Sequence, residues 1–372
     1  MGRKHIIHLV VGARPNFIKA APLLSEFAES LPEVNVKLVH TGQHYDYNMS
    51  QVFFRQLRLP EPNFYLGIGS GLHGEQTGKL LEALEQLFLQ DKPDLVLVLG
   101  DVNSTLAAAL AAVKIHIPVA HVEAGLRSNN MHMPEEINRI LTDHISDILF
   151  VTEEAGIHNL LREGIPEEKV HLVGNVMIDA LANLMPVVRS SDVLERLNLL
   201  PGEYAVATLH RPATVDNQEG LTHIKDVLAG VVRERKVVFP VHPRTAESIL
   251  KFKMQNSLDS LDGLMMTEPY GYIDFMKLVS ESSFVMTDSG GIQSEASYMG
   301  VPCITLREST EHQITLSSGT NTLVGKDVTR IKHAIHEASN FNRSSYTAPG
   351  YLDGNASERI GKILGKIMLG FR

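Results

Sequence analysis

Short runs of Val, Leu and Ile recur along the whole chain, and segments with helical character separate them. Near-continuous apolar runs of this kind are typical of strands that are buried on both faces of a parallel sheet. Their alternation with helices predicts an α/β fold of doubly wound, Rossmann-like parallel sheets. The predicted strands are Ile6–Val11, Val36–His40, Leu95–Leu99, Val119–Val122, Ile148–Val151, Val170–Val173, Tyr204–Thr208, Val237–Val241, Leu264–Thr267, Ser283–Met286, Pro302–Leu306 and Thr322–Val324.

The length of the chain indicates two domains. Its 372 residues exceed the size of about 250–300 residues at which single hydrophobic cores stop growing. A helix near 177–187, followed by a polar segment, marks the boundary. We therefore expect an N-terminal Rossmann-like domain at 1–174 and a second one at 175–355. A last helix within 356–372 is expected to cross back to the first domain.

Composition excludes several kinds of partner. The net charge is −9 and the basic residues are scattered, which argues against a nucleic-acid or anionic-membrane partner. The single cysteine, Cys303, cannot form an internal disulfide and is expected to be a structural thiol in a reducing compartment. The apolar run Ile6–Val11 is too short for a signal peptide or a membrane span, so a cytoplasmic protein is expected. None of the 17 histidines lies in a zinc-binding pattern, so no metal is expected.

The segment Phe284–Arg307 has the pattern strand, glycine turn, helix, strand, which is a βαβ unit. Ligands of such sheets bind at the carboxyl ends of the strands. There the N–H groups of Gly290 and Gly291 begin a helix, where a phosphate can approach the backbone and is favoured by the helix dipole. Ser289 is the expected N-cap, and Glu295, one turn further, could bind the two hydroxyls of a ribose. The alternative is a turn that simply requires glycines before a capped helix.

Two polar clusters follow predicted strands in the first half of the chain. Arg14 enters a helix directly after the first strand, within the segment 12–19, where a guanidinium can bind a diphosphate. Asp101 follows the strand Leu95–Leu99. It is either a functional carboxylate or the N-cap of the next helix.

Further polar residues lie at strand ends and helix starts. Strand periodicity places His121 and Glu123 on one face, and a glutamate that ends a buried strand is costly unless it is paired or functional. Glu135 begins a helix, where the dipole favours acidic residues, and Arg139 at i+4 offers an ion pair as the simpler explanation. His210 follows the first strand of the second half. Three carboxylates in one domain, with a histidine and a phosphate-binding turn in the other, favour a catalytic cleft between the domains.

One glycine-rich segment, Gly69–Gly74, matches the dinucleotide-binding pattern G-x-G-x-x-G. The strand before it is poor, because it contains Pro60, Pro62 and Asn63, and it does not belong to the first βα unit of the sheet. We therefore expect a flexible, lid-like loop here rather than a nicotinamide site, and no added NAD or NADP.

With these residues in place, the chain resembles the non-hydrolysing UDP-N-acetylglucosamine 2-epimerases over nearly its whole length. The resemblance implies the GT-B arrangement of two Rossmann-like domains with the active site in the cleft between them, a homodimer, and no cofactor. It also implies interconversion of UDP-GlcNAc and UDP-ManNAc for cell-surface polysaccharide. The motifs that carry it are Gly12–Lys19, His40–His44, Gly100-Asp101, His121–Arg127, Pro134–Arg139, Gly174–Ala180, His210-Arg211, Thr287–Glu295 and Leu306-Arg307.

The resemblance implies a mechanism as well. The C2 hydrogen of the sugar is not acidic, because no neighbouring carbonyl stabilises a carbanion. The family is understood to eliminate UDP, forming 2-acetamidoglucal, and to add it back with C2 protonated on the other face. This requires acid–base groups near the sugar and a cationic, dipolar clamp on the diphosphate. By motif match, the acid–base residues are Asp101, Glu123 and Glu135, with His210 close to the diphosphate, and the UDP-binding residues are Arg14, Lys19, Tyr270, Phe275 against the uracil, Ser289, Gly290, Gly291, Glu295 and His312.

The sequence departs from the family pattern at three places, and one of them is the loop between Glu123 and Glu135, which is shorter than in the familiar bacterial members. Many members carry Glu-Arg-Pro-Glu where this chain reads Glu311 to Ile314, so His312 stands where an arginine associated with UDP is expected. Several bacterial members bind UDP-GlcNAc at a second, activating site through two glutamines; Gln43 is kept here, but the other position reads Asp46. These changes leave room for a modified substrate, such as a UDP-2,3-diacetamido sugar or its uronic acid.

Three other functions share part of this pattern. A GT-B glycosyltransferase would have the same fold and nucleotide site but would need an acceptor. A non-catalytic UDP-sugar sensor would not need to keep acid–base groups, and a hydrolysing epimerase would release free ManNAc. The three carboxylate motifs and His210 favour the non-hydrolysing epimerase.

Overall fold

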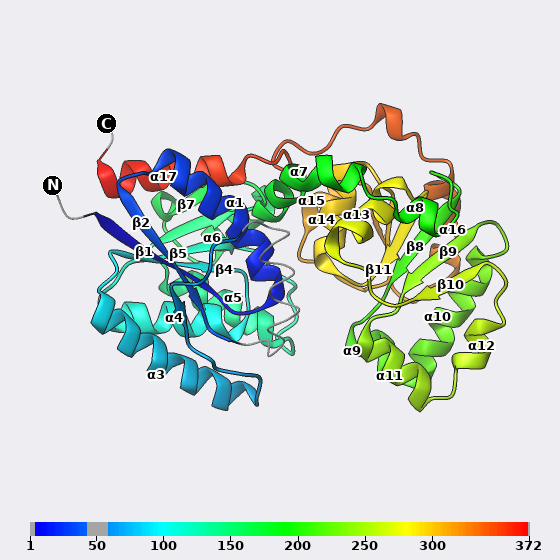
Figure 1. The fold of residues 1–372 in the computed structure, drawn as a ribbon, viewed down its shortest axis with the longest axis horizontal. Coiled ribbons are helices and arrows are strands. Elements are labelled where there is room, and N and C mark those ends of the chain that lie inside the picture. The colour runs from blue at the N-terminus through cyan, green and yellow to red at the C-terminus, as the bar shows by residue number, and fades with distance from the viewer. Residues whose placement is uncertain (1–3, 43–58, 371–372) are drawn as a thin grey trace. The chain divides into compact units, whose positions relative to one another are not determined.

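The computed structural model describes residues 4–42 and 59–370 of the chain (Figure 1). A helix that the sequence pattern favours at 47–57, and the positions Gln43 and Asp46, lie outside the described residues.

The chain divides into two compact units. Unit 1 comprises Met1–Asn183 together with Asp353–Arg372, and unit 2 comprises Leu184–Leu352. The division falls inside helix α7 (Val176–Arg189), the helix that follows the last strand of unit 1. Each unit has its own parallel sheet and its own hydrophobic core.

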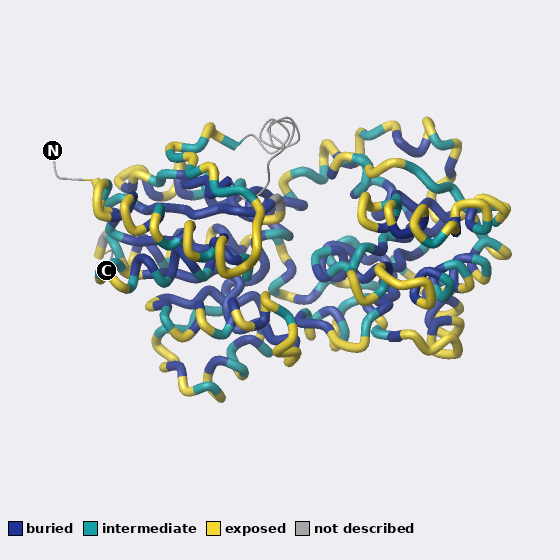
Figure 2. The backbone as a smooth tube through the Cα atoms, turned by 90° about the horizontal axis from the view of Figure 1, so that it is seen from below, coloured by how far each residue is buried: buried dark blue, intermediate teal, exposed yellow. Residues whose placement is uncertain are grey.

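The described strands of unit 1 form one parallel sheet in the order β3-β2-β1-β4-β5-β6-β7. The predicted parallel α/β architecture is thus confirmed, and strands β4 and β5 are buried along their whole length. Figure 2 shows the buried backbone in dark blue within each unit. The short edge strand β3 was not predicted, because Pro60 and Pro62 precede it. The strands are β1 (His5–Val11), β2 (Val34–His40), β3 (Phe64–Tyr65), β4 (Leu95–Leu99), β5 (Val119–Ala124), β6 (Ile148–Val151) and β7 (Val170–Leu172).

Helices cover both faces of this sheet, as a doubly wound fold requires. A core of Leu, Val and Ala side chains from α3 and α4 packs on β1, β4 and β5. Besides α7, the described helices of unit 1 are α1 (Arg14–Ser30), α3 (His73–Asp91), α4 (Asn103–Lys114), α5 (Pro134–Ile145), α6 (Glu154–Arg162), the short 3-10 turn η1 (Glu167–Lys169) and α17 (Ala356–Leu369).

The last helix, α17, packs against α1 in unit 1 (Figure 1). Its N-terminus is held by the buried carboxylate of Asp179 from α7, which accepts hydrogen bonds from the backbone N–H groups of Ala356 at 3.1 Å and Ser357 at 2.5 Å. Burial raises the pKa of Asp179 despite these hydrogen bonds. The carboxylate therefore serves as the N-terminal cap that α17 itself does not supply.

Unit 2 repeats the same plan, with a parallel sheet in the order β10-β9-β8-β11-β12-β13. Its strands are β8 (Tyr204–Thr208), β9 (Lys236–Pro240), β10 (Leu264–Thr267), β11 (Phe284–Thr287), β12 (Cys303–Thr305) and β13 (Asn321–Leu323). Its helices are α8 (Val193–Arg196), α9 (Pro212–Val215), α10 (Gln218–Val231), α11 (Pro243–Lys251), α12 (Gln255–Asp259), α13 (Tyr272–Glu281), α14 (Gly290–Met299), α15 (Gln313–Ser317), α16 (Val328–Ser339) and the 3-10 turn η2 (Arg343–Ser345).

The strand order reverses at one point in each sheet, between β1 and β4 in unit 1 and between β8 and β11 in unit 2. In open α/β sheets, ligands bind outside the carboxyl ends of the strands at this switch point. The residues that follow these four strands are Gly12, Gly100, Leu209 and Asp288. Each lies in or next to one of the polar clusters that the sequence pattern singled out.

Within residues 4–42 and 59–370, no helix combines the length and the apolar character that a membrane span needs. The same residues contain no group of three or more His, Cys, Asp or Glu side chains placed to hold a metal ion.

Candidate active site

At the switch point of unit 1, one buried amide joins the ends of β1 and β4. The side chain of Asn16 accepts hydrogen bonds from the N–H groups of Gly12 at 3.3 Å and Ala13 at 3.1 Å, and it donates one to the carbonyl of Leu99 at 3.1 Å. Sequence reasoning gave Asn16 no role, although it lies within the motif 12–19. Arg14 opens α1 beside it, and its side chain lies outside the described part of the structure.

Beside this amide, Lys19 and Glu123 form a buried ion pair, with both residues 8% exposed. The pair lies against Gly100, where a Cβ atom would meet the Oε2 of Glu123 and the Nζ of Lys19 at 3.2 Å each. Gly100 also has a φ of +66°, which a residue with a Cβ adopts only with strain. The glycine before Asp101 is thus required both by its backbone conformation and by the ion pair.

Glu123 does not follow the strand periodicity that the sequence pattern predicts. Its φ is +74°, and the register between β5 and β6 shifts between Val122 and Ala124, so a β-bulge carries the glutamate. A left-handed conformation at a non-glycine residue costs about 1–3 kcal/mol and concentrates at functional sites. The bulge directs the carboxylate of Glu123 to Lys19. Strict alternation along the strand would instead have placed it on the same face as His121.

Asp101 makes its contacts with the first turns of α5. Its carboxylate pairs with the Nη2 of Arg139 at 2.6 Å, and its carbonyl accepts a hydrogen bond from Asn138 at 2.9 Å. The N-cap position of α4 is Val102, so the interpretation of Asp101 as the cap of that helix is wrong. The side chain of Asp101 is 30% exposed, which leaves it accessible to a ligand.

Glu135 and its neighbour Glu136 have different environments in α5. Glu136 is 1% exposed; it pairs with the Nη1 of Arg139 at 2.6 Å and accepts hydrogen bonds from the backbone N–H groups of Ser128 and Asn129. Glu135 is exposed. Arg139 forms its ion pairs with Asp101 and Glu136. These two pairs replace the ion pair with Arg139 that was the simpler explanation for Glu135. Sequence reasoning missed Glu136, although its i+3 spacing from Arg139 was a signal.

At the switch point of unit 2, a buried carboxylate, Asp288, joins the ends of β8 and β11. It accepts hydrogen bonds from the backbone N–H groups of His210 at 3.1 Å and Arg211 at 2.9 Å, and its Oδ1 lies 3.1 Å from the Nδ1 of His210. Burial alone would raise the pKa of Asp288, but the hydrogen bonds and charge of His210 and the backbone hydrogen bonds outweigh it, so the pKa is lowered. Asp288 therefore fixes His210, and sequence reasoning had not assigned it this role.

The glycine turn after Asp288 begins α14, as predicted. Ser289 occupies the N-cap position, but its side chain makes no capping hydrogen bond, so the turn is not explained as a capped helix alone. A Cβ atom at Gly290 would lie 2.7 Å from the Oε1 of Glu311 and 3.3 Å from the Nε2 of His312. His312 thus lies beside the predicted phosphate-binding turn, with Gly291 next in the same helix start.

Further along α14, the carboxylate of Glu295 is enclosed in the unit. The hydroxyl of Tyr272 donates a hydrogen bond to its Oε1 at 2.6 Å. Burial raises the pKa of Glu295 to about 7, and the hydrogen bond from Tyr272 opposes this rise. The two aromatic residues that the resemblance predicts to bind the nucleotide lie close to Tyr272 in the chain: Tyr270 precedes α13 and Phe275 lies within it, and both are half-buried. Tyr272 itself was not predicted.

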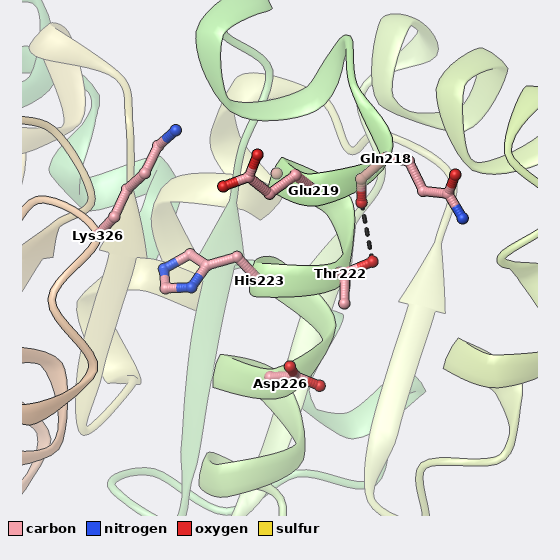
Figure 3. A pocket seen from close by; sticks show the side chains of 7 residues that line it. Gln218, Glu219, Thr222, His223, Asp226 and Lys326 are labelled. Atoms are coloured by element: carbon pink, nitrogen blue, oxygen red, sulfur yellow. Dashed lines mark hydrogen bonds between the residues drawn. The ribbon is translucent and has the colours of Figure 1, made fainter.

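A cavity of about 550 Å³ lies elsewhere in unit 2, beside the first turns of α10 (Figure 3). Glu219 and His223 extend from the helix towards Lys326. None of the predicted site residues lines this cavity, and its charged groups of both signs select no class of ligand, so we assign it no role. Its lining residues are Gln218, Glu219, Gly220, Thr222, His223, Asp226 and Lys326.

Several known proteins are similar to this chain over nearly its whole length. The family described as UDP-N-acetylglucosamine 2-epimerase matches residues 28–365. The UDP-N-acetylglucosamine 2-epimerase of Methanocaldococcus jannaschii is 42% identical over 96% of this chain and 98% of its own length. A crystal structure of this Methanocaldococcus jannaschii enzyme, in complex with UDP-GlcNAc and UDP, matches with a TM-score of 0.88 at 41% identity, covering 96% of this chain and 99% of that one.

Two further matches bear on substrate and fold. The UDP-2,3-diacetamido-2,3-dideoxy-D-glucuronate 2-epimerase of Pseudomonas aeruginosa is 41% identical over 96% of this chain and 99% of its own length. The lipopolysaccharide outer core galactosyltransferase WaaB matches with a TM-score of 0.58 at 14% identity, over 98% of this chain and 100% of that one, which shows a shared fold alone.

Proposed function

Because the chain belongs to the UDP-N-acetylglucosamine 2-epimerase family, we propose that it interconverts UDP-GlcNAc and UDP-ManNAc by eliminating UDP and adding it back. The enzyme is an isomerase of nucleotide sugars. The observation that carries the proposal is the pair of carboxylates at the switch point of unit 1, Asp101 and Glu123, each held by a cation, Arg139 and Lys19 respectively. The C2 hydrogen of the sugar is not acidic, so it can be removed and returned only where such acid–base groups are in place.

The residues of unit 1 carry the proton transfers in this proposal. Asp101 comes two residues after the end of β4 and Glu123 lies near the end of the neighbouring strand β5, and the register between these strands ends with Leu99 opposite Val122, so both residues lie at the same edge of the sheet. Glu135 is the third proton-transfer carboxylate, accessible on α5. Lys19 was expected to bind UDP; its ammonium contacts Glu123, so we assign it to the carboxylates, where it balances their negative charge.

The residues of unit 2 bind the leaving group. The backbone N–H groups of Gly290 and Gly291 at the start of α14, together with the helix dipole, accept the diphosphate. His210 is oriented by Asp288 to stabilise the charge that develops when the bond to UDP breaks. Glu295, oriented by Tyr272, binds the ribose hydroxyls. Arg14, Ser289, Tyr270, Phe275 and His312 complete the proposed nucleotide site, with Phe275 against the uracil.

The decisive experiment follows the hydrogen at C2. Incubation of the protein with UDP-GlcNAc in D2O should yield UDP-ManNAc and UDP-GlcNAc that carry deuterium at C2, because the proton is lost to solvent-exchanging groups and regained. Proton NMR of the sugar ring measures the loss of the C2 signal in both epimers. An active preparation that transfers no deuterium, or that releases free sugar without any UDP-linked epimer, would refute the proposal in favour of sugar transfer or hydrolysis.

A UDP-2,3-diacetamido uronic acid is a second candidate substrate. It is favoured by the relative from Pseudomonas aeruginosa that acts on such a sugar, and by His312 at the position where many family members carry arginine. The same D2O experiment with both nucleotide sugars, under identical conditions, separates the candidates. The substrate with the larger kcat/KM is the true one. We also propose that the enzyme is a cytoplasmic homodimer, which sedimentation and cell fractionation test directly.

The position of His312 beside Gly290 predicts a pH-dependent affinity for UDP. An imidazole carries a full charge only below about pH 6.5, whereas a guanidinium is charged throughout. His312→Arg should therefore bind UDP about tenfold more tightly than the wild type at pH 8, since a hydrogen bond to a charged group contributes about 1.5–3 kcal/mol. At pH 6 the two proteins should bind UDP nearly equally.

Calorimetric titration with UDP at pH 6 and pH 8 measures both affinities, and His312→Ala provides the control without a donor. In the wild type the affinity should weaken between the two pH values, and in His312→Ala it should be low at both. The same pH dependence in all three proteins would show that His312 does not contact the nucleotide.

A further inference from the structure

The two carboxylates near the ends of β4 and β5 are carried by irregular backbone. Asp101 follows Gly100, whose φ is +66°, and Glu123 sits in the bulge of β5 with a φ of +74°. The conformation at Glu123 is strained because the residue has a Cβ atom, so other groups must hold the bulge in place. The groups that do so form a buried charged network behind the site, in which the mechanism above uses no member.

The centre of the network is Asp143, near the end of α5 and 1% exposed. Its Oδ2 accepts a hydrogen bond from the backbone N–H of Gly125 at 3.1 Å and lies 2.8 Å from the Nη1 of Arg127. Its Oδ1 lies 2.7 Å from the Nδ1 of His121. His121 and Gly125 lie two residues before and two residues after Glu123, so the single carboxylate of Asp143 contacts the bulge at both ends.

The other ring nitrogen of His121 reaches the second segment. The imidazole is fully buried, and its Nε2 lies 2.8 Å from the carbonyl oxygen of Gly100. A carbonyl only accepts hydrogen bonds, so Nε2 must carry a hydrogen. The contact fixes the residue directly before Asp101.

Further contacts fix the carboxylate of Asp143. Burial by itself would raise the pKa of Asp143, but the hydrogen bonds and charges of His121 and Arg127 outweigh it, and the pKa is lowered. The carboxylate pairs with Arg127, and Arg127 in turn pairs with Glu163 at 2.7 Å. Asp143 is therefore held against the bulge from two sides, by the backbone of Gly125 and by Arg127.

We propose that His121 and Asp143 are positioning residues for the proton-transfer step, because together they hold the Gly100 turn and the Glu123 bulge in one fixed geometry. The inference rests on the proposed function of Asp101 and Glu123. Both residues are buried, His121 at 0% and Asp143 at 1% exposure, so the pair acts through the two segments that it contacts. Its effect is on the placement of the two carboxylates, where a shift of about 1 Å can lower a rate by about 10²-fold.

Two substitutions of His121 separate its two contacts. The amide nitrogen of glutamine can take the place of Nε2, and that of asparagine the place of Nδ1. His121→Gln thus keeps the donor to Gly100, and His121→Asn keeps the donor to Asp143. Each should lower kcat by about 10²-fold, with KM and the Kd of UDP within about twofold of the wild type, because unit 2 is unchanged. His333→Gln, on the exposed face of α16, is the matched control and should keep full activity.

A second measurement examines the wild type, and the variants serve only to assign its signals. In ¹⁵N NMR the His121 ring should carry a hydrogen on Nε2, the nitrogen that faces the carbonyl of Gly100. An Nε2 without a hydrogen would overturn the contact to the Gly100 turn.

Normal kcat in either His121 variant, or a parallel loss of kcat, KM and UDP binding, would reduce the pair to a structural element and refute the proposal. A wild type that exchanges no C2 hydrogen would instead refute the proposed function, and the imidazole signal would still decide whether His121 contacts the Gly100 turn.

Discussion

Glu123→Gln should lower kcat by about 10²–10⁴-fold, the usual effect of removing a group that transfers a proton in the transition state. Asp101→Asn should have an effect of the same size, because Asp101 follows the neighbouring strand at the same edge of the sheet. UDP binding should stay nearly unchanged in both, since neither residue belongs to the proposed nucleotide site. Steady-state kinetics and calorimetry with UDP give the two quantities, and Glu168→Gln, an exposed residue of unit 1, is the matched control.

The stability of these variants has to be measured alongside, because Glu123 is the partner of the buried Lys19. Removing one member of a buried ion pair destabilises a protein by about 3–5 kcal/mol, since the other charge is left without compensation. Glutamine keeps an acceptor oxygen for the ammonium, so the loss should be smaller than in Glu123→Ala. A folded Glu123→Gln with near-normal kcat would remove Glu123 from the mechanism.

Glu135→Gln distinguishes two roles for an exposed residue at the start of a helix. If Glu135 transfers a proton, its kcat should fall by about 10²-fold or more. If it only interacts with the helix dipole, the substitution should cost about 0.3–1 kcal/mol of stability and leave turnover unchanged. The kinetics and the thermal unfolding of this one variant therefore assign the residue.

Asp288→Ala should produce the largest loss of stability among single changes at the nucleotide side of the site. The substitution leaves the backbone N–H groups of His210 and Arg211 without their acceptor, and each such buried group costs about 1–3 kcal/mol. The ring of His210 also loses the carboxylate that orients it. Asp288→Asn keeps one acceptor oxygen and should lose about half as much. Asp262→Ala, at an exposed position of unit 2, is the control.

The contribution of Asp288 to the free energy of unfolding should decrease in acid. Its pKa is lowered in the folded protein from an ordinary value of 3.8, so its contribution is complete above that value and is lost as the pH falls through the lowered pKa. Urea unfolding should therefore show a constant difference between wild type and Asp288→Ala from pH 6 to pH 8, and a smaller difference in acid below pH 3.8. A difference that grows in acid would contradict the assigned ionisation state.

The sequence by itself determined the fold class and the places where a site could form. Apolar runs of strand length, alternating with helices, are compatible only with buried parallel strands, and polar residues directly after such runs must lie at one edge of a sheet. The glycine turn at Gly290 and the positions of Asp101, Glu123 and His210 follow from local pattern, because each depends only on its neighbours in the chain. The short strand β3 escaped the pattern, since its prolines weaken the local signal.

Only the tertiary structure decided which groups meet. The strand order places β1 beside β4 and β8 beside β11, and no local pattern states that order. It follows that Lys19 pairs with Glu123 and that Asp288 holds His210. It also follows that Asp143 contacts the bulge while His121 contacts the Gly100 turn. The bulge itself breaks the period of two on which strand prediction rests. These contacts join residues from 18 to 104 positions apart in the chain. A buried charge is costly unless it is paired, but which group becomes its partner depends on the sheet that brings the two together.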